Sequence, residues 1–344
     1  MAAERWWRPD VLARKASALR ARDAIRGATR NFFAGQGFSE VDTPTLQVSP
    51  GLEPHLRAFA TSLEESDGAR PLFLHTSPEF AMKKLLAAGM PKIFQLAHAF
   101  RNGERSATHH PEFTMLEWYR AGADYRALMA DCEGLLHATA AASGVTRLTW
   151  RGKDCDPAAP WQRLSVAEAF HRYAGLDILA TAPDPRQPDR TRLAAAAAGI
   201  GVAPHDGDDW EDLFFRIFLE RIEPLLGSPA PTLLTDYPIA LAALARAKPG
   251  DPRIAERVEL YVAGLELANG FSELTDAAEQ RARFARDRAK QTEAGVAPYP
   301  VDEDFLAALE SLPDSAGMAL GFDRLVMLAT GARSIDDVLW APLD

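Results

Sequence analysis

Two neighbouring β-rich segments restrict most strongly what this chain can fold into. The segments are KIFQLAHAFR (92–101) and PEFTMLEWYR (111–120), and the polar stretch NGERSATHH (102–110) separates them. Both have the β-forming, aromatic-rich composition of strands. Together they predict an antiparallel hairpin with a long, charged connection.

Further strand signals occur on both sides of this hairpin. FSEVDTP (38–44) and PLFLH (71–75) precede it, and TLLTDYP (232–238) and RVELYVAGLELANGF (257–271) follow it. The strands come in antiparallel pairs with helices outside them, not in βαβ alternation. This arrangement favours an α+β domain built on an antiparallel sheet.

Helical patterns occupy much of the remaining chain. Apolar residues recur at helical spacing from 10 to 35, after a cap expected at Asp10. Ser77 is expected to cap a second helix, with Pro78 at its first position. Residues 124–226 are predicted to be mainly helical.

Length and composition allow one large domain, which we expect over 1–344 with the segment 124–226 as a helical insertion. We find no apolar leader, no stretch long enough to span a bilayer and no CxxC pair. A cytoplasmic protein without membrane contact is therefore expected. The net charge of −10 argues weakly against nucleic acid as the main partner.

Residues 315–328, SAGMALGFDRLVML, place small residues at alternate positions. Gly317, Ala319 and Gly321 precede Arg324 and an apolar run, which predicts a strand followed by a helix. The small residues form either a tight spot in a packed core or a floor under a ligand. Neither common phosphate-binding loop, GxGxxG or GxxxxGK[ST], was found, so a nucleotide would need another scaffold.

The connection of the first hairpin carries a second candidate site. Arg101 lies at the end of one expected strand, and Phe113 lies near the start of the other. An arginine beside an aromatic ring can hold a phosphate and stack a base. The same charges could also be the solvated surface of a hairpin, so both interpretations stay open on composition alone.

Three segments in order, GFSEVDTP, FRNGE…HHPEFTMLEWY and GMALGFDR, resemble motifs 1, 2 and 3 of class II aminoacyl-tRNA synthetases. TSPE, TDYP and ELANGFSELTD narrow the resemblance to the lysyl-tRNA synthetase branch, and the likeness covers nearly the whole chain. The short segment before motif 1 leaves no room for the anticodon-binding domain of that branch. A catalytic body without this domain is similar to the elongation factor P lysylase family. The resemblance implies an antiparallel β-sheet flanked by helices.

The resemblance implies an ATP site. Arg101 would contact the α-phosphate and Arg324 the γ-phosphate as the catalytic residues, and Phe113 would stack on adenine. Further ATP contacts are implied at Asn102, Gly103, Glu104, His110, Glu259, Leu260 and Gly321.

The resemblance also implies an amino-acid pocket. Glu273, with Glu79, would face ammonium groups of the ligand, and such a site should reject analogues that lack them. Gly270 would let the chain bend between the sheet and the pocket wall. The implied contacts are Ser77, Pro78, Glu79, Tyr119, Glu266, Asn269, Phe271, Glu273 and Ala319.

Ala319 is a hint about the ligand itself. The lysyl-tRNA synthetase pattern has Gly at this position, and the elongation factor P lysylase pattern has Ala. One added methyl against the ligand can change a preference by about 1–3 kcal/mol. We therefore expect β-lysine to be preferred over α-lysine, and Ala319→Gly to move the preference toward α-lysine.

Glu259 and Glu266 are implied as Mg²⁺ ligands, together with phosphate oxygens of ATP. A two-residue loop at Ala263-Gly264 would pair Tyr261 with Glu266. Glu259 lies two residues before Tyr261 and therefore shares its face of the sheet. Both carboxylates then point the same way. The alternative is a pair of solvated charges on the sheet.

Two positions depart from the family pattern. Gly103 stands where an acidic residue is usual and Glu104 follows it, so the residue that fills this role is open. His110 stands where an asparagine is usual, and the hydrogen bonds it can make depend on its tautomer.

The implied activity is ATP-dependent formation of a lysyl or β-lysyl adenylate, followed by transfer of the acyl group to a lysine of elongation factor P. ATP and Mg²⁺ would be required, and motif 1 implies a homodimer. The alternatives are a truncated lysyl-tRNA synthetase that charges tRNA and a non-catalytic paralogue that binds an aminoacyl nucleotide.

Overall fold

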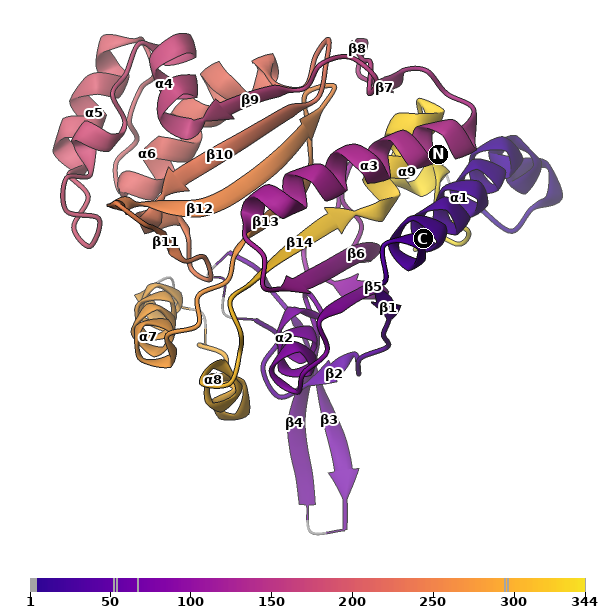
Figure 1. Ribbon diagram of the computed structural model, residues 1–344, viewed down its shortest axis with the longest axis horizontal. Helices are drawn as coiled ribbons and strands as arrows, with labels where there is room; N and C mark the ends of the chain where they lie inside the picture. Colours follow the sequence, from indigo (N-terminus) through magenta and orange to yellow (C-terminus); the bar gives the residue numbers. More distant parts are fainter. Residues whose placement is uncertain are drawn as a thin grey trace.

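A computed structural model describes residues 5–51, 53, 55–66, 68–293, 295 and 297–343. Within these ranges a nine-stranded sheet runs through the molecule in the order β1-β5-β6-β14-β13-β12-β10-β9, and β11 pairs with β12 (Figure 1). Its strands are β1 (Ser39–Glu40), β5 (Lys92–Phe100), β6 (Glu112–Ala121), β9 (Gln162–Ser165), β10 (Thr232–Pro238), β11 (Ala247–Lys248), β12 (Asp251–Val262), β13 (Leu265–Ser272) and β14 (Ser315–Gly321).

The six central strands of this sheet, β5, β6, β14, β13, β12 and β10, pair antiparallel with their neighbours. The predicted α+β fold with an antiparallel sheet is confirmed for this part. The two edges differ, because β1 pairs with β5 and β9 pairs with β10 in parallel. The sheet as a whole is therefore mixed.

One face of the sheet is covered by α1 (Pro9–Gly35), α3 (Tyr125–Ser143) and α9 (Phe322–Thr330). Alternate residues of each strand point to this face. Leu116 and Trp118 of β6, with Met318 and Leu320 of β14, pack there in the main hydrophobic core. These residues take the even numbers in β6 and β14, which leaves the odd-numbered side chains on the opposite face.

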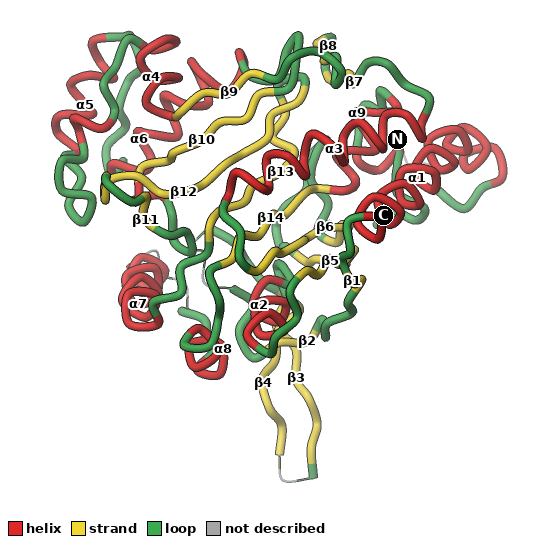
Figure 2. The backbone as a smooth tube through the Cα atoms, viewed as in Figure 1, coloured by secondary structure: helices red, strands yellow, loops and turns green. Residues whose placement is uncertain are grey.

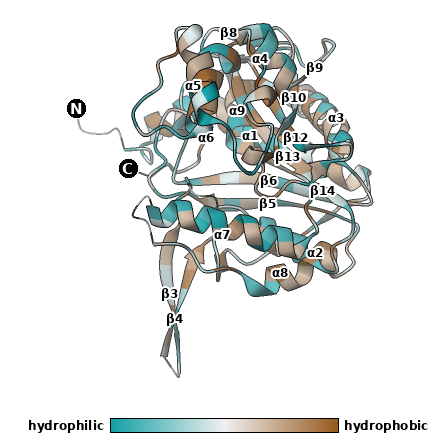
Figure 3. Cartoon of the chain, turned by 90° about the vertical axis from the view of Figure 1, so that its left-hand side faces the viewer, coloured by the Kyte–Doolittle hydropathy of each residue, from teal (hydrophilic) through white to brown (hydrophobic). Residues whose placement is uncertain are grey.

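The opposite face is covered by helices at both ends, and the first group lies over β6. There α2 (Glu79–Ala87), α7 (Ala277–Glu293) and α8 (Glu303–Leu309) lie side by side, and many residues of α7 are hydrophilic (Figure 3). Phe80 of α2, Phe284 of α7 and Phe305 of α8 form a smaller apolar cluster against Tyr119 of β6. The middle of this face is left for a cavity.

A second core lies at the far end of the sheet around α4 (Val166–Ala174), α5 (Arg190–Gly199) and α6 (Trp210–Ile217). Figure 2 shows these helices grouped beside β9 and β10. The segment 124–226 is thus mostly helical but also contains β7 (Leu148–Trp150), β8 (Lys153–Cys155) and β9. That it is an insertion in a single domain stays a prediction.

A hairpin projects from the body of the molecule. It consists of β3 (Phe59–Glu65) and β4 (Gly68–Leu74), and β2 (Leu46–Gln47) joins it at its base (Figure 1). The strand predicted at 71–75 is the last part of β4.

Several element boundaries differ from prediction. The first helix begins at Pro9, with Arg8 as its N-cap and Asp10 in the first turn, so the cap predicted at Asp10 is wrong. Proline is favoured at the first helical position because it has no N–H to satisfy. The strand predicted over 38–44 is reduced to the two residues of β1.

The second helix begins one residue later than predicted, so the N-cap predicted at Ser77 is wrong, whereas the second hairpin has the predicted turn. Helix α2 starts at Glu79 with Pro78 as its N-cap, and Ser77 Oγ accepts the N–H of Glu79 at 3.0 Å. Ala263 and Gly264 join β12 and β13 with φ values of 52° and 79°. Positive φ at both positions is typical of a type I′ turn.

Gly270 has a role different from the predicted bend. It lies within β13, opposite Met318 of β14. A Cβ at this position would lie 2.5 Å from the main-chain oxygen of Gly317 and 2.9 Å from Cα of Met318. The absence of a side chain therefore permits the close approach of two central strands.

We predict that Gly270→Ala destabilises the protein by about 1–3 kcal/mol, because the added methyl meets main-chain atoms that cannot move aside. Gly27→Ala is the matched control, since a Cβ at Gly27 in α1 meets nothing within 4 Å. The control should stabilise the helix by about 0.5–1 kcal/mol. Urea unfolding of both variants checks this, and equal effects would contradict it.

Candidate active site

A cavity of about 340 Å³ lies over the face of the sheet that α1, α3 and α9 leave uncovered. Strands β6, β14 and β13 form its floor, and α2 and the β5–β6 connection contribute its walls. The predicted site residues that line it are Ser77, Glu79, Arg101, Glu104, His110, Phe113, Tyr119, Glu266, Asn269, Phe271, Ala319, Gly321 and Arg324.

Six predicted residues do not line the cavity, and two of them, Glu259 and Glu273, are buried. Asn102 and Gly103 are exposed in the β5–β6 connection, whereas Glu104 lines the cavity. Of Gly103 and Glu104, the structure therefore favours Glu104 for the acidic role in motif 2. Pro78 is buried at the N-cap of α2. Leu260 points into the main core because alternate residues of β12 face opposite sides, so only its main chain remains for a ligand.

The alternating small residues of β14 form a floor under the cavity. Gly317 lies opposite Tyr119, and a Cβ at Gly317 would lie 2.1 Å from Cε1 of that ring and 2.6 Å from Oε1 of Glu273. A side chain at this position would therefore displace both groups. Ala319 lies between Glu117 and Asn269 and is half-buried, so its methyl faces the cavity.

Glu117 is a carboxyl at the closed end of the cavity that the sequence analysis did not single out. Its Oε1 accepts the hydroxyl of Ser77 at 2.6 Å, and its Oε2 accepts that of Tyr119 at 2.9 Å. Burial and then repulsion from Glu79 raise the pKa of Glu117 to about 8, which these hydrogen bonds offset only in part.

Glu273 lies beside Glu117 and is almost completely buried. Its carboxylate pairs with the ammonium of Lys83, and Lys83 also pairs with Glu79 one helical turn away. Burial raises the pKa of Glu273 to about 8, and although Lys83 opposes this rise, Glu79 and Glu117 add to it. Three carboxyls thus converge on one end of the cavity.

Arg324 lies at the opposite end of the cavity floor, in the first turn of α9. Its guanidinium donates to the main-chain oxygen of Glu266 at 2.9 Å and lies 2.8 Å from Nε2 of His109. Burial and then the charge of Arg324 lower the pKa of His109. A neutral His109 can accept a hydrogen bond from Arg324 and so fix its direction.

Arg101 and Phe113 lie together on the β5–β6 side of the cavity. The guanidinium carbon of Arg101 is 5.2 Å from the centre of the Phe113 ring, a distance suited to a cation–π contact. The Nε atom of Arg101 is buried and has no hydrogen-bond partner among the described residues. A buried guanidinium nitrogen of this kind is expected to bind an acceptor.

Glu266 and Glu259 lie on the same face, as the hairpin register predicted, because Tyr261 pairs with Glu266. Glu266 lines the cavity, and burial followed by repulsion from Glu259 raises its pKa to about 7. Glu259 is buried and accepts hydrogen bonds from Arg257 and Tyr261, both at 2.6 Å, and from Tyr237. In the described ranges no three His, Cys, Asp or Glu side chains form a metal site.

His110 is buried, and both of its ring nitrogens contact the main chain. Nδ1 contacts the oxygen of Glu112, and Nε2 accepts the N–H of Leu343 at 3.1 Å. The ring therefore ties the end of the chain to motif 2, and the contact to ATP predicted for His110 stays a prediction.

A buried ion pair lies next to Arg324, under that end of the cavity floor. Arg22 of α1 pairs with Asp323, the residue before Arg324, and donates to Thr114 Oγ1 at 2.9 Å. Asp323 Oδ2 also accepts the N–H of Thr114 at 2.7 Å. Helix α1, strand β6 and helix α9 are thereby joined directly beneath Phe113 and Arg324.

The chain is similar in sequence to known proteins. Residues 4–344 match the family described as tRNA synthetases class II (D, K and N). The chain belongs to this family. The class II synthetase fold predicted from the three motifs is therefore confirmed.

Three individual relatives show which branch of this family the chain is similar to. The chain is 40% identical to the "Elongation factor P--(R)-beta-lysine ligase" of Vibrio cholerae serotype O1, over 95% of each chain. It is 40% identical to the protein of the same name in Vibrio parahaemolyticus, over 98% of each, and 41% identical to that of Klebsiella pneumoniae, over 94% of each. The predicted resemblance to the elongation factor P lysylase branch of class II synthetases is confirmed.

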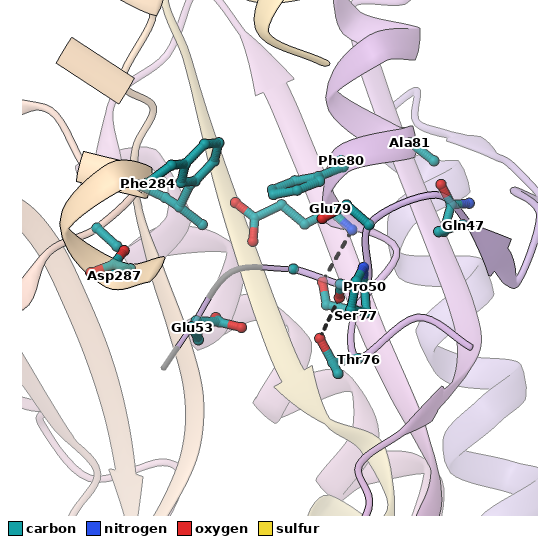
Figure 4. Close-up of a pocket in the computed structure, with 14 residues that line it drawn as sticks. Gln47, Pro50, Glu53, Thr76, Ser77, Glu79, Phe80, Ala81, Phe284 and Asp287 are labelled. Carbon is teal, nitrogen blue, oxygen red and sulfur yellow. Dashed lines mark hydrogen bonds between the residues drawn. The ribbon is translucent and has the colours of Figure 1, made fainter. Parts of the chain in front are cut away.

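A smaller pocket adjoins the main cavity and shares Glu53, Ser77 and Glu79 with it. Figure 4 shows Glu79 between Asp287 of α7 and Ser77. Burial raises the pKa of Asp287 to about 6. The pocket beside the class II site is thus also lined by acidic side chains.

We predict that Arg22→Met destabilises the protein by about 3–5 kcal/mol, because the buried Asp323 carboxylate loses its guanidinium partner. Arg30→Met is the control, since Arg30 forms an exposed pair with Glu40 at 2.8 Å and should cost no more than about 1 kcal/mol. Guanidinium chloride unfolding measures both. A loss for Arg22→Met as small as the control's would contradict the role assigned to this ion pair.

Proposed function

We propose that this chain is an ATP-dependent ligase that activates (R)-β-lysine, or lysine, as an aminoacyl adenylate and transfers it to a lysine side chain of elongation factor P. The relatives that carry this activity in their names span nearly the whole chain. The alternatives are tRNA charging and non-catalytic binding. The names of these relatives favour neither of them.

The two ends of the cavity suit the two halves of an aminoacyl adenylate. In the first step the substrate carboxylate attacks the α-phosphorus, an oxygen–phosphorus bond forms, and pyrophosphate leaves. Arg101 and Arg324 would stabilise the charge that develops on the phosphates, and Phe113 would stack on the base. In the second step the neutral ε-amine of the acceptor lysine attacks the acyl carbon and AMP leaves.

The observation that carries the substrate assignment is the charge at the closed end of the cavity. Glu79, Glu117 and Glu273 converge there, and Lys83 is the cation that the described residues pair with them. When all three carboxyls are ionised, two negative charges remain unbalanced. A ligand with two ammonium groups, such as lysine or β-lysine, would balance them, and a ligand with one would not.

Ala319 supports the β-amino acid. Its methyl lies on the cavity floor between Glu117 and Asn269, and so occupies space beside the acidic residues. The preference for β-lysine over α-lysine is part of the proposal.

Mg²⁺ is the metal that the family chemistry implies, and we assign it to Glu266 and Glu259. Glu266 faces the cavity with a pKa raised to about 7, so a bound cation would favour its ionised form. Glu259 keeps lone-pair capacity on Oε1, which accepts one hydrogen bond in the structure. The metal would neutralise phosphate charge during adenylate formation.

A homodimer and a cytoplasmic location complete the proposal. Leu46 and Val48, which follow motif 1, are 46% and 41% exposed, so they are available for a subunit contact. Among the described residues no helix is long and apolar enough to cross a bilayer. Nucleic acid is not proposed as a partner.

We predict that the protein exchanges pyrophosphate into ATP in the presence of lysine or β-lysine, and then acylates elongation factor P but not tRNA. Arg324→Ala should lower the exchange rate by at least about a hundredfold, because it removes a charged contact to the departing phosphates. Arg333→Ala, which alters an exposed arginine just after α9, is the control. Normal exchange by Arg324→Ala, or loss of its folded structure, would contradict the motif 3 assignment.

We predict that KM for the diamino acid falls as the pH rises from 6 to 8. Glu117 and Glu273 have pKa values raised to about 8 in the empty pocket, and they must lose protons to hold ammonium groups. Binding is therefore weak below these pKa values and strengthens through them, by about tenfold per pH unit for each proton released. Exchange assays at constant saturating ATP measure this, and a KM independent of pH would be inconsistent with the charge argument.

A further inference from the structure

Lys83 is a buried ammonium that takes no part in the two chemical steps of the proposed reaction. It lies in the middle of α2 with 2% of its surface exposed. Its Nζ lies 2.5 Å from Oε2 of Glu273, contacts Oε1 of Glu79, and lies 5.2 Å from the centre of the Phe271 ring. All three contacts are with residues predicted to bind the amino acid.

The burial of Lys83 needs an explanation beyond packing. Removing an ammonium from water is costly unless carboxylates pair with it, and an apolar side chain of similar volume would serve the core at least as well. Phe305 of α8 lies on another side of Nζ, 5.9 Å from its ring centre, so the ammonium is held between aromatic rings and the two acids. The site therefore fixes a positive charge at one point behind the pocket wall.

The carboxylate of Glu273 depends on the positive charge of Lys83 for its stabilisation. Both of its carboxylate oxygens are buried without a hydrogen-bond donor among the described residues, so its ion pair with Lys83 is its main polar contact. Oε1 points to the position that a Cβ on Gly317 would occupy, on the cavity floor. Lys83 thus holds Oε2 of Glu273, and Oε1 lies over Gly317 of the cavity floor.

We propose that Lys83 is a positioning residue that sets the charge of the amino-acid pocket. It holds Glu79 and Glu273 in place and leaves a deficit of two positive charges, which a substrate with two ammonium groups fills. This inference rests on the proposed function. It adds the residue whose charge determines how many ammonium groups of the ligand the pocket balances.

The charged and titratable groups that face this part of the pocket come from three elements. They are Glu79 and Lys83 of α2, Glu117 and Tyr119 of β6, and Glu273 at the end of β13. Burial opposes the charge of Lys83, but Glu273 and Glu79 more than offset this and raise its pKa above the usual range. Lys83 therefore stays charged over the pH range in which Glu117 and Glu273 titrate.

Removal of the Lys83 charge should change how pH controls substrate binding. Without the ammonium, the acids repel one another unopposed, and Glu117 and Glu273 retain their protons to higher pH. The diamino acid then has to displace those protons at neutral pH, and its apparent affinity falls. The affinity should return at higher pH, where the carboxyls ionise before the ligand binds.

The test compares Lys83→Met, which keeps an unbranched side chain one atom shorter and removes the charge, with Lys84→Met as a matched control. Lys84 is next on the same helix and pairs with Asp302 and Asp304 at 2.9 and 2.8 Å, outside the cavity lining. KM for lysine and β-lysine and KM for ATP are measured by pyrophosphate exchange from pH 6 to pH 9. Folding is checked by circular dichroism and thermal unfolding.

For Lys83→Met we expect the pH at which the amino-acid KM reaches its low plateau to rise by about one unit or more. At pH 7 the KM should then rise at least about tenfold, with KM for ATP unchanged. Lys84→Met should match the wild type. Lys83→Arg, which keeps the charge, should keep the wild-type pH dependence even where its larger size raises KM.

An unshifted pH profile in Lys83→Met would overturn the inference, as would an equal shift in Lys83→Arg. If Lys83→Met does not fold, Lys83→Gln carries the same expectation. Failure of both neutral variants to fold would show a purely structural role and would also overturn it. If the wild-type protein activates neither lysine nor β-lysine, the proposed function itself fails, which is a result distinct from these.

Discussion

Alternation of side chains in two adjacent strands, β6 and β14, determines both the core and the site. In β6 and β14 the even-numbered residues, such as Trp118 and Met318, pack under α1, α3 and α9. The odd-numbered residues, such as Glu117 and Gly317, face the cavity. A shift of one residue in β6 would bury Glu117 in the apolar core, so the register and the chemistry are fixed together.

The cavity then has opposite charges at its two ends. Arginines 101 and 324 lie where phosphates are expected, and the glutamates of the closed end have pKa values raised by their burial. The protein maintains this arrangement with two buried ion pairs beside the cavity, Arg22 with Asp323 and Lys83 with Glu273. Such pairs add little net stability but hold groups in fixed positions, which is what a pre-formed adenylate site needs.

Much of this was predictable from local sequence, and the rest was not, for physical reasons. The hairpin turn at Ala263-Gly264 depends on neighbouring residues only, and it was predicted correctly. Glu117 was missed, although period-two alternation from Phe113 and Tyr119 places it on the same face. Arg22 and Asp323 lie 301 positions apart, so only the tertiary fold reveals their contact. The position of the first helix cap was wrong because Pro9 competes with Asp10 for the helix start.

The central claim is that buried carboxyls in the empty pocket must ionise to receive a ligand with two ammonium groups. Calorimetric titration of the protein with the diamino acid at pH 7, in buffers of different ionisation enthalpy, measures the protons exchanged on binding. The account predicts release of about one to two protons, because Glu117 and Glu273 have pKa values near 8 before binding. Binding with no net proton release, or with proton uptake, would contradict it.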